Sequence, residues 1–270
     1  RWEEMGHLLA ATELLNISTY QSNMCFDEKR EGWGNTTASN QFISSMLTLS
    51  LALRAVNLQS GISESSRLAA MSLIHEVNSE VYLGQFMDLN TLSVSKLERY
   101  ISADESVFMN DYLQRCRLIG SSMFRLACIG TYGVASRPSY ASALSVYFNS
   151  LGLAGQVLND LGDYMPDANR PYAAQYGDLR MGRLTFPTYL LARAKHPAIE
   201  YACSNAPEIR MELESATAHL VASGIARKCR ELLSRECWAP MKRALKDLSD
   251  NVPEELLRPF TFGRHYIFES

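Results

Sequence analysis

The sequence predicts an all-α protein, and three observations lead to this prediction. Apolar residues recur at spacings of three and four along most of the 270 residues, which is the period of an amphipathic helix. Alternating strand patterns and Asn-Gly hairpin signals are absent from the sequence. None of the breaks between helical segments has the composition of a flexible linker. We therefore expect one bundle-like domain that spans residues 1–270.

The predicted helices are separated by breaks that contain Gly, Pro, Asn or Ser, the residues that commonly end helices. The segment EGWGN follows the first helix, QSGIS follows the second, and ASRPS precedes the long helix that leads into a loop over 165–184. The segments KHP and NVP mark further breaks. The predicted helices cover 3–27, 37–57, 64–89, 93–101, 104–133, 139–164, 185–203, 207–235 and 239–248, with a short piece at 253–260.

Composition excludes two broad classes of function. The chain is 47% hydrophobic and 20% charged with a formal net charge of −3, and it has no lysine-rich block or basic stripe. Nucleic acid is therefore not an expected partner. The longest apolar stretches, such as MLTLSLALRAV from Met46, are shorter than the roughly 20 residues that span a bilayer. No transmembrane segment is predicted.

Cysteine usage indicates a reducing compartment. The six cysteines at 25, 116, 128, 203, 229 and 237 form no CxxC pair and have no histidine at ligand spacing, which argues against a zinc site and a disulfide scaffold. We expect buried free thiols and a cytoplasmic protein. Because the chain opens at Arg1 and runs directly into a helical pattern, we also expect that an upstream segment is missing.

Polar residues gather at the end of the predicted helix 139–164. Gln156, Asp160 and Asp163 are spaced by four and three, which places them on one side of the helix, and Asn159 is adjacent. A solvated helix face is the ordinary explanation of such a stripe. However, carboxylates at a helix C-terminus repel one another and lie near the negative pole of the helix dipole. A cation would relieve this repulsion.

The chemistry of these residues suits Mg²⁺ and a phosphate. Hard divalent cations take oxygen ligands from a few carboxylates and share the remaining positions with substrate phosphates. The loop that follows supplies Arg180 and Arg183, whose guanidinium groups can hold phosphate oxygens. We therefore expect a stack in which the carboxylates bind a metal ion, the metal ion binds a diphosphate, and the arginines hold the diphosphate oxygens.

These residues resemble a known family, the trans-isoprenyl diphosphate synthases, also called polyprenyl synthetases. The match includes Asn159-Asp160-x-x-Asp163 followed by Asp178-Leu-Arg-x-Gly-Arg183-x-Thr-x-Pro, which is similar to the second aspartate-rich motif and its loop. The stretch VYLGQFMDL over 81–89 is similar to the family's Gly-Gln-x-x-Asp-Leu helix. Residues 13–42 align with the first aspartate-rich segment without a gap.

The resemblance implies an isoprenoid synthase fold, a helical bundle with a central cavity in which two acidic motifs bind three magnesium ions and an allylic diphosphate. It also implies a homodimer and a prenyl diphosphate substrate, of which we expect farnesyl or geranylgeranyl diphosphate. The metals would draw charge from the leaving diphosphate, and the cavity would protect the allylic cation from water.

The roles of individual residues follow from the same resemblance. The expected catalytic residues are Asp27, Asp160 and Asp163. The expected Mg²⁺ ligands are Asp27, Asn159, Asp160 and Asp163, and the expected substrate-binding residues are Gln85, Gln156, Asp178 and Arg183.

The departures from the family pattern are as informative as the matches. The first motif, Asp-Asp-x-x-Asp in the family, is Asn23-Met24-Cys-Phe-Asp27 here, so two of its three carboxylates are lost. The family's arginine pair falls on Gly32-Trp33, with Arg30 nearby, and its Lys-Thr pair falls on Ile119-Gly120. Phosphate contacts are therefore missing at two places.

Two functions agree with a weakened first motif beside a nearly complete second motif. In the first, the protein ionises one prenyl diphosphate with Mg²⁺ and then cyclises or deprotonates the cation, as terpene synthases do, or transfers it to an acceptor, as ComQ-like peptide prenyltransferases do. In the second, it is a non-catalytic partner subunit of a polyprenyl diphosphate synthase. We favour the enzyme, because carboxylates clustered without a metal would cost stability through repulsion.

Overall fold

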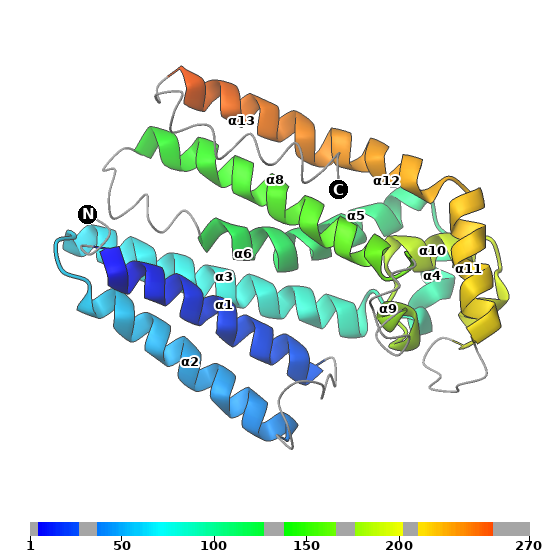
Figure 1. The fold of residues 1–270 in the computed structure, drawn as a ribbon, viewed down its shortest axis with the longest axis horizontal. Coiled ribbons are helices and arrows are strands. Elements are labelled where there is room, and N and C mark those ends of the chain that lie inside the picture. Colours follow the sequence, from blue (N-terminus) through cyan, green and yellow to red (C-terminus); the bar gives the residue numbers. More distant parts are fainter. Residues whose placement is uncertain (1–4, 27–36, 127–137, 166–175, 202–209, 251–270) are drawn as a thin grey trace.

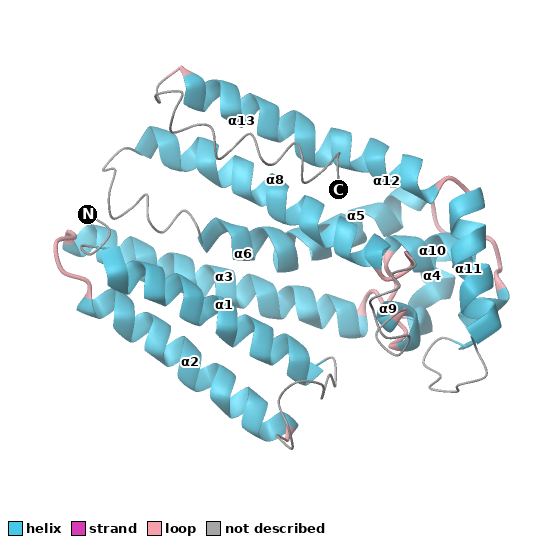
Figure 2. Ribbon diagram, viewed as in Figure 1, coloured by secondary structure: helices cyan, strands magenta, loops and turns pink. Residues whose placement is uncertain are grey.

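The computed structural model describes residues 5–26, 37–126, 138–165, 176–201 and 210–250. Within these ranges the chain is helical and contains no β-strand (Figures 1 and 2). The longer helices are α1 (Gly6–Phe26), α2 (Ala38–Leu58), α3 (Glu64–Asn90), α5 (Glu105–Cys116), α8 (Pro138–Gly162), α10 (Phe186–Arg193), α11 (Arg210–Ala222), α12 (Ile225–Leu233) and α13 (Ala239–Ser249). The short ones are η2 (Val94–Lys96), α4 (Leu97–Ile101), η3 (Arg117–Ser121), α6 (Ser122–Arg125), α9 (Gly177–Arg180), η6 (Pro197–Tyr201) and η8 (Ser234–Trp238).

The all-α prediction is confirmed, and the four longest helices lie within three residues of their predicted bounds. Two of them begin at side-chain caps. Thr37 accepts a hydrogen bond from the backbone N–H of Asn40, and Ser63 accepts one from the backbone N–H of Ser66. These bonds satisfy N–H groups that have no partner within the helix. The helix predicted at 253–260 lies outside the described residues.

Two predicted helices are wrong as continuous elements. The segment 185–203 ends as an α-helix at Arg193, because Lys195 adopts a left-handed backbone with φ of 53°. In the segment 207–235, Gly224 has φ of 72° and separates α11 from α12. A left-handed residue cannot continue a right-handed helix, and glycine adopts that conformation at little cost. Conversely, the predicted loop 165–184 contains the short helix α9.

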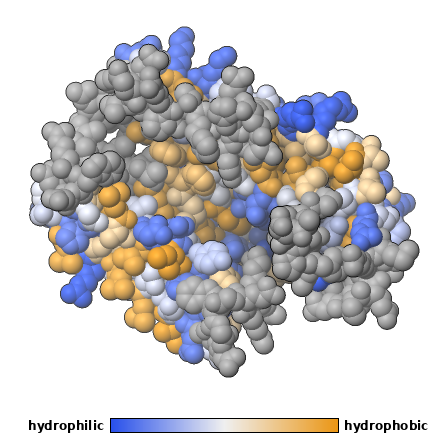
Figure 3. All heavy atoms as spheres, viewed as in Figure 1, coloured by the Kyte–Doolittle hydropathy of each residue, from blue (hydrophilic) through white to orange (hydrophobic). Residues whose placement is uncertain are grey.

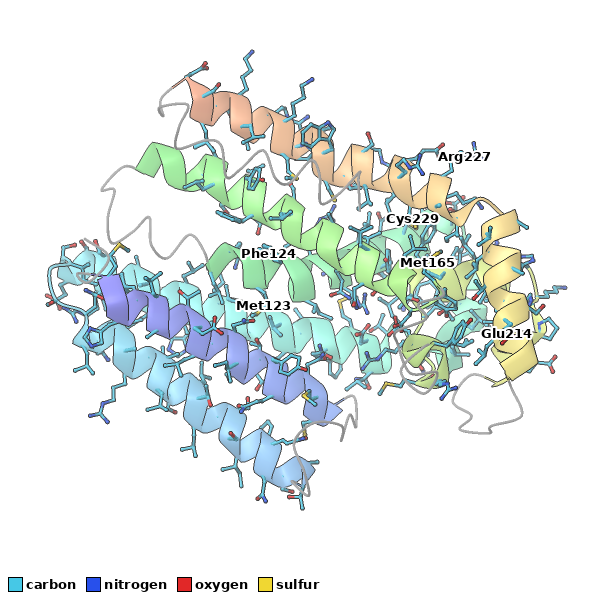
Figure 4. The ribbon with its side chains drawn as sticks, viewed as in Figure 1. Met123, Phe124, Met165, Glu214, Arg227 and Cys229 are labelled. Carbon is cyan, nitrogen blue, oxygen red and sulfur yellow. The ribbon has the colours of Figure 1, made fainter. Side chains whose placement is uncertain are left out.

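The helices pack around two hydrophobic cores. The helices α1, α2 and α3 lie side by side, α6 lies between α3 and α8, and α13 runs along α8 (Figure 1). One core is formed largely by α1, α2 and α3, and Met123 of α6 packs against it. The other joins α5, α8 and α10 to α13, and includes Cys229 and, at its edge, Met165 (Figure 4). Apolar side chains gather in the central part of the face shown in Figure 3.

Aromatic rings fill the core beneath the end of α8. Tyr100, Phe108, Tyr112 and Tyr189 are each fully buried. The rings of Phe108 and Tyr189 are stacked with centroids 3.9 Å apart, and Phe108 also stacks on Tyr112 at 5.6 Å. Such pairs add to the stabilisation that comes from burial alone. This rigid core holds one face of α5 against the end of α8.

The loop that follows α9 is attached to the end of α3. The backbone N–H of Val94 donates to the carbonyl of Gly182 at 2.7 Å, and that of Leu184 donates to Leu92 at 2.8 Å. These two hydrogen bonds form an isolated antiparallel β-bridge between Ser93 and Arg183. The predicted phosphate-binding Arg183 is thereby brought beside the C-terminal end of α3, although the two lie far apart in the sequence.

A pair of glycines lets η3 approach α8 closely. A Cβ on Gly152 would lie 2.7 Å from the carbonyl carbon of Gly120 and 2.8 Å from Cα of Ser121. A Cβ on Gly120 would meet Gly152 in the same way. Gly120 falls on the threonine of the Lys-Thr pair in the family that the sequence resembles, and here a contact between two backbones occupies this position.

Three of the cysteines are buried free thiols, as the sequence predicts: Cys116, Cys229 and Cys237. Burial raises the pKa of each thiol to about 12. Cys25 is partly exposed, and Cys128 and Cys203 lie outside the described residues. Among the helices of the described ranges, none is long and apolar enough to cross a membrane.

Candidate functional site

Six buried charged side chains meet where the ends of α3 and α8 approach α5, and we call them the buried charged cluster. Among the residues that the structure describes, they are all of the charged side chains classed as buried. Burying a charge is costly unless it is paired, so their gathering at one place makes this the candidate functional site. The members of the cluster are Asp88, Arg115, Asp160, Asp163, Asp178 and Arg183.

Arg115 joins two carboxylates from different helices. Its Nε donates to Oδ1 of Asp88 at 2.6 Å and its Nη2 donates to Oδ2 of Asp88 at 3.2 Å. Its Nη1 donates to Oδ2 of Asp160 at 2.8 Å. The Arg115 and Asp88 side chains are each 3% exposed, and that of Asp160 is 0% exposed. The forked guanidinium therefore connects α3 with α8 through α5.

Asp160 accepts three hydrogen bonds from protein side chains. Besides Arg115, the hydroxyl of Tyr112 donates to Oδ2 at 2.9 Å, and Nε2 of Gln156 donates to Oδ1 at 2.8 Å. Burial raises the pKa of the Asp160 carboxyl, and the Arg115 guanidinium opposes the rise by favouring the charged form. Burial likewise raises the pKa of Tyr112 well above its usual value, which keeps its hydroxyl protonated as a donor.

A second part of the cluster lies just beyond α8. Oδ2 of Asp163 accepts the backbone N–H of Asp178 at 3.0 Å, and Oδ1 of Asp178 lies 3.7 Å from Nη1 of Arg183. Oδ2 of Asp178 is buried and has no hydrogen-bond partner. Burial raises the pKa of Asp178 well above its usual range, and the carboxylates of Asp160 and Asp163 raise it further by repulsion.

A divalent cation could balance the net negative charge of the buried charged cluster. Four buried carboxylates face two buried guanidinium groups, which leaves two negative charges when all are ionised. No group of three acidic, His or Cys side chains in the described ranges is arranged to hold a metal. Mg²⁺ needs only one or two carboxylates when substrate phosphates complete its shell. Asp163 and the open oxygen of Asp178 fit that requirement.

The first motif contributes little charge in the described residues. Oδ1 of Asn23 accepts a hydrogen bond from Nε2 of Gln85 at 2.6 Å, and Met24 is buried. Oε1 of Gln85 is buried without a partner. The amide pair thus links α1 to α3 one turn before Asp88. Asp27, the remaining carboxylate of the motif, lies outside the described residues, as do Arg30 and Gly32-Trp33.

The structure brings most of the predicted site residues together. Asp160, Asp163, Asp178 and Arg183 belong to the buried charged cluster, and Gln156 bonds to Asp160. Asn159, a predicted Mg²⁺ ligand, is exposed to solvent beside them. The metal-binding and catalytic roles of these residues stay predictions.

Sequence reasoning missed Arg115 and Tyr112, and it noted Asp88 without assigning it to the site. One pattern in the sequence could have found Arg115. It lies seven residues after Phe108 and three after Tyr112, and it precedes Cys116, so it occupies the apolar face of α5. A charge on a face that otherwise packs into a core needs a buried partner.

Solved structures with the same fold are prenyl diphosphate synthases. A decaprenyl diphosphate synthase from Rhodobacter capsulatus is 22% identical with a TM-score of 0.72, over 97% of this chain and 78% of that one. A geranylgeranyl pyrophosphate synthetase from Pyrococcus horikoshii is 17% identical with a TM-score of 0.76, over 99% and 80%. A heptaprenyl diphosphate synthase from Staphylococcus aureus is 17% identical with a TM-score of 0.71, over 97% and 79%.

These likenesses confirm the predicted isoprenoid synthase fold. A search of curated proteins finds no significant match. The family model of the polyprenyl synthetases, in contrast, matches residues 24–220, which include the buried charged cluster and most of the helices around it. The chain therefore belongs to the polyprenyl synthetase family.

Proposed function

We propose that this chain binds an allylic prenyl diphosphate together with Mg²⁺ and ionises it, in isoprenoid biosynthesis. Membership of the polyprenyl synthetase family supports the coarser statement, that the reaction is a prenyl transfer. One observation supports the metal. The buried charged cluster has two more carboxylates than guanidinium groups, and one oxygen of Asp178 is buried without a partner. A buried carboxylate oxygen in this setting is a position at which a cation can bind.

Each part of the cluster has a role in this proposal. Asp163 and Asp178 hold the cation, and Arg183, next to Asp178, donates to the phosphate oxygens. Bound Mg²⁺ supplies the charge that stabilises the departing diphosphate as its C–O bond breaks. The bridge between Ser93 and Arg183 holds the phosphate-binding loop against the end of α3. The surrounding apolar core excludes water from the site.

The fate of the allylic cation is the second part of the proposal. Ile119 and Gly120 occupy the positions of the family's Lys-Thr pair. A Cβ on Gly84 of α3 would come within 2.5 Å of the Ile119 side chain, and Gly120 packs against Gly152 of α8. Contacts between helices therefore occupy the two positions at which the family's lysine and threonine would contact phosphate. We infer one diphosphate site, so that cyclisation, elimination or transfer to an acceptor other than isopentenyl diphosphate follows ionisation. Farnesyl or geranylgeranyl diphosphate is the proposed substrate.

A non-catalytic partner subunit is the second candidate function. The described part of the first motif favours it, because Met24 is buried in the core and Asn23 is bonded to Gln85 rather than open to a metal. A subunit of this kind would stabilise an active synthase without binding metal itself. The homodimer that the family resemblance implies, and the cytoplasmic location expected from the cysteines, belong to the enzyme proposal. Sedimentation equilibrium tests the dimer.

The decisive experiment measures pyrophosphate release and products. The protein is incubated with Mg²⁺ and geranyl, farnesyl or geranylgeranyl diphosphate, with and without isopentenyl diphosphate, and the extract is analysed by mass spectrometry. We expect release from one allylic substrate alone, with a hydrocarbon or alcohol product. EDTA, Asp178→Asn and Arg183→Glu should each abolish release. Glu231→Gln, an exposed carboxylate on α12, is the matched control and should retain it.

Three other outcomes would change the proposal. A longer diphosphate that forms only with isopentenyl diphosphate would establish chain elongation and contradict the single diphosphate site. Full release by Asp178→Asn would remove the cluster from the reaction. No release with any substrate, together with no change in Tm on adding Mg²⁺ and a non-hydrolysable prenyl diphosphate analogue, would favour the partner subunit.

A further inference from the structure

Arg115 lies between two carboxylates of the buried charged cluster. It contacts carboxylates on two helices, Asp88 of α3 and Asp160 of α8, which are 27 and 45 positions away in the sequence. All three side chains are almost completely buried. A buried guanidinium is costly unless its charge and its N–H groups are matched. Here two carboxylates match both.

Asp160 has little capacity left for a metal ion. Three of its four lone-pair positions accept hydrogen bonds, from Arg115, Tyr112 and Gln156. Its side chain has no exposed surface. Mg²⁺ requires a nearly octahedral shell and keeps several water molecules. Because the side chain is fully buried, a hydrated ion could reach the remaining lone-pair position only by displacing the groups that surround it.

The other end of the cluster differs in this respect. Asp178 has a buried oxygen, Oδ2, that accepts no hydrogen bond, and Nη1 of Arg183 lies 3.7 Å from its other oxygen, Oδ1. Arg115 is therefore in direct hydrogen-bond contact with Asp88 and Asp160, whereas Oδ2 of Asp178 accepts no hydrogen bond.

We infer that Arg115 is a built-in cation that closes Asp160 to divalent metals. The second acidic motif then binds metal only on its Asp163 and Asp178 side, and the chain takes fewer divalent ions than its motif suggests. Arg115 acts as a positioning residue: it fixes the ends of α3 and α8 relative to each other with a charge that cannot dissociate. The position of the remaining metal, though not the closure of Asp160, rests on the proposed function.

The inference predicts opposite results for two substitutions. Asp160→Asn removes a carboxylate that binds no metal, so the number of Mn²⁺ ions bound should stay unchanged and their affinity should change less than about twofold. An orienting outer partner of a metal site usually costs about 10–100-fold when it is lost, so a direct ligand should cost at least as much. Arg115→Gln removes the guanidinium group that pairs with Asp88 and Asp160, and the two freed carboxylates should add one Mn²⁺ site. The stoichiometry is measured by electron paramagnetic resonance of free Mn²⁺.

Thermal unfolding gives a second measurement that does not depend on activity. Arg115→Gln should lower Tm in EDTA, because two buried carboxylates lose their partner, and Mn²⁺ should restore much of the loss. Arg117→Gln, two residues further along, removes an exposed guanidinium paired with Glu236 and serves as the matched control. It should show neither the fall nor the restoration. If Arg115→Gln does not fold, Asp88→Asn with Arg115→Gln keeps the net charge of the cluster and should also open Asp160.

The outcomes separate this inference from the proposed function. Loss of Mn²⁺ binding in Asp160→Asn would overturn the inference and leave the proposed metal dependence standing. An unchanged Mn²⁺ count in Arg115→Gln, or in the charge-neutral pair of substitutions, would also overturn it and reduce the contact to a structural ion pair. No Mn²⁺ binding by the wild type, with one ion bound by Arg115→Gln, would support the inference and refute the metal in the proposed function.

Discussion

Replacing Gly152 by alanine tests whether the close contact between η3 and α8 is a structural requirement. The new Cβ would lie 2.7 Å from the carbonyl carbon of Gly120 and 2.8 Å from Cα of Ser121. Both distances are about 1 Å short of the roughly 3.5–4.0 Å optimum for carbon contacts. All of the opposing atoms belong to the backbone, so no side chain can rotate away. The two helices must therefore separate.

The magnitude follows from two opposing terms. Overpacking of a core costs about 1–3 kcal/mol, and a contact between two backbones should lie at the upper end of that range. Alanine gains about 1 kcal/mol over glycine in a helix interior. The net destabilisation is then about 2 kcal/mol, which corresponds to a fall in Tm of roughly 4–8 °C for a chain of this class. Separation of the helices would also disturb Gln156, whose Cβ lies near this contact.

The assay is thermal unfolding followed by circular dichroism at 222 nm. Gly162→Ala is the matched control, because it lies at the end of the same helix and its Cβ would meet nothing within 4 Å. The control should have a Tm equal to or above that of the wild type. A Tm for Gly152→Ala that is also equal to or above the wild-type value would refute the reasoning.

The remaining predictions concern the buried charges and one histidine. Tyr112→Phe removes a hydrogen bond to the buried Asp160, so urea unfolding should show a loss of about 1.5–3 kcal/mol; no loss would mean that the hydroxyl contributes nothing. Without metal, wild-type stability should fall as pH rises above about 4, because the raised pKa of Asp178 lets the folded state bind more protons than the unfolded state. Asp178→Asn should reduce this fall and raise Tm at pH 7; parallel Tm curves would contradict it. Burial and His219 lower the pKa of His196, whose Nδ1 accepts the backbone N–H of Ala198. The unfolded state then binds more protons, so Tm should fall as pH falls below about 6.5, and by less in His196→Gln; an equal fall would exclude this histidine as the cause.

Much of the fold could be predicted from the sequence because its signals are local. The spacing of apolar residues depends only on the helix period, and it located α1, α2, α3 and α8 to within three residues. The breaks within 185–203 and 207–235 were harder to predict. They depend on the left-handed backbone of Lys195 and Gly224, and single residues of this kind carry a weak signal in a helical pattern.

For the site, too, the residues that lie close together in the sequence could be predicted, and the contacts between distant segments could not. The helix period placed Gln156, Asp160 and Asp163 on one side of a helix, the chemistry of the following loop indicated Arg183, and the family resemblance added Asp178. The structure places Asp160, Asp163, Asp178 and Arg183 in one cluster. Those residues are close in the sequence, so spacing and local motif were sufficient.

Only the tertiary structure decided what neutralises these charges. Arg115 lies 45 positions before Asp160 and 27 after Asp88, and it meets both because the aromatic core packs α5 against the ends of α3 and α8. No local pattern specifies such a contact, because its energy depends on burial and on charges that different helices bring together. The sequence by itself determined an all-α chain with an acidic motif, and the packing of three helices decided that Arg115 pairs with Asp88 and Asp160.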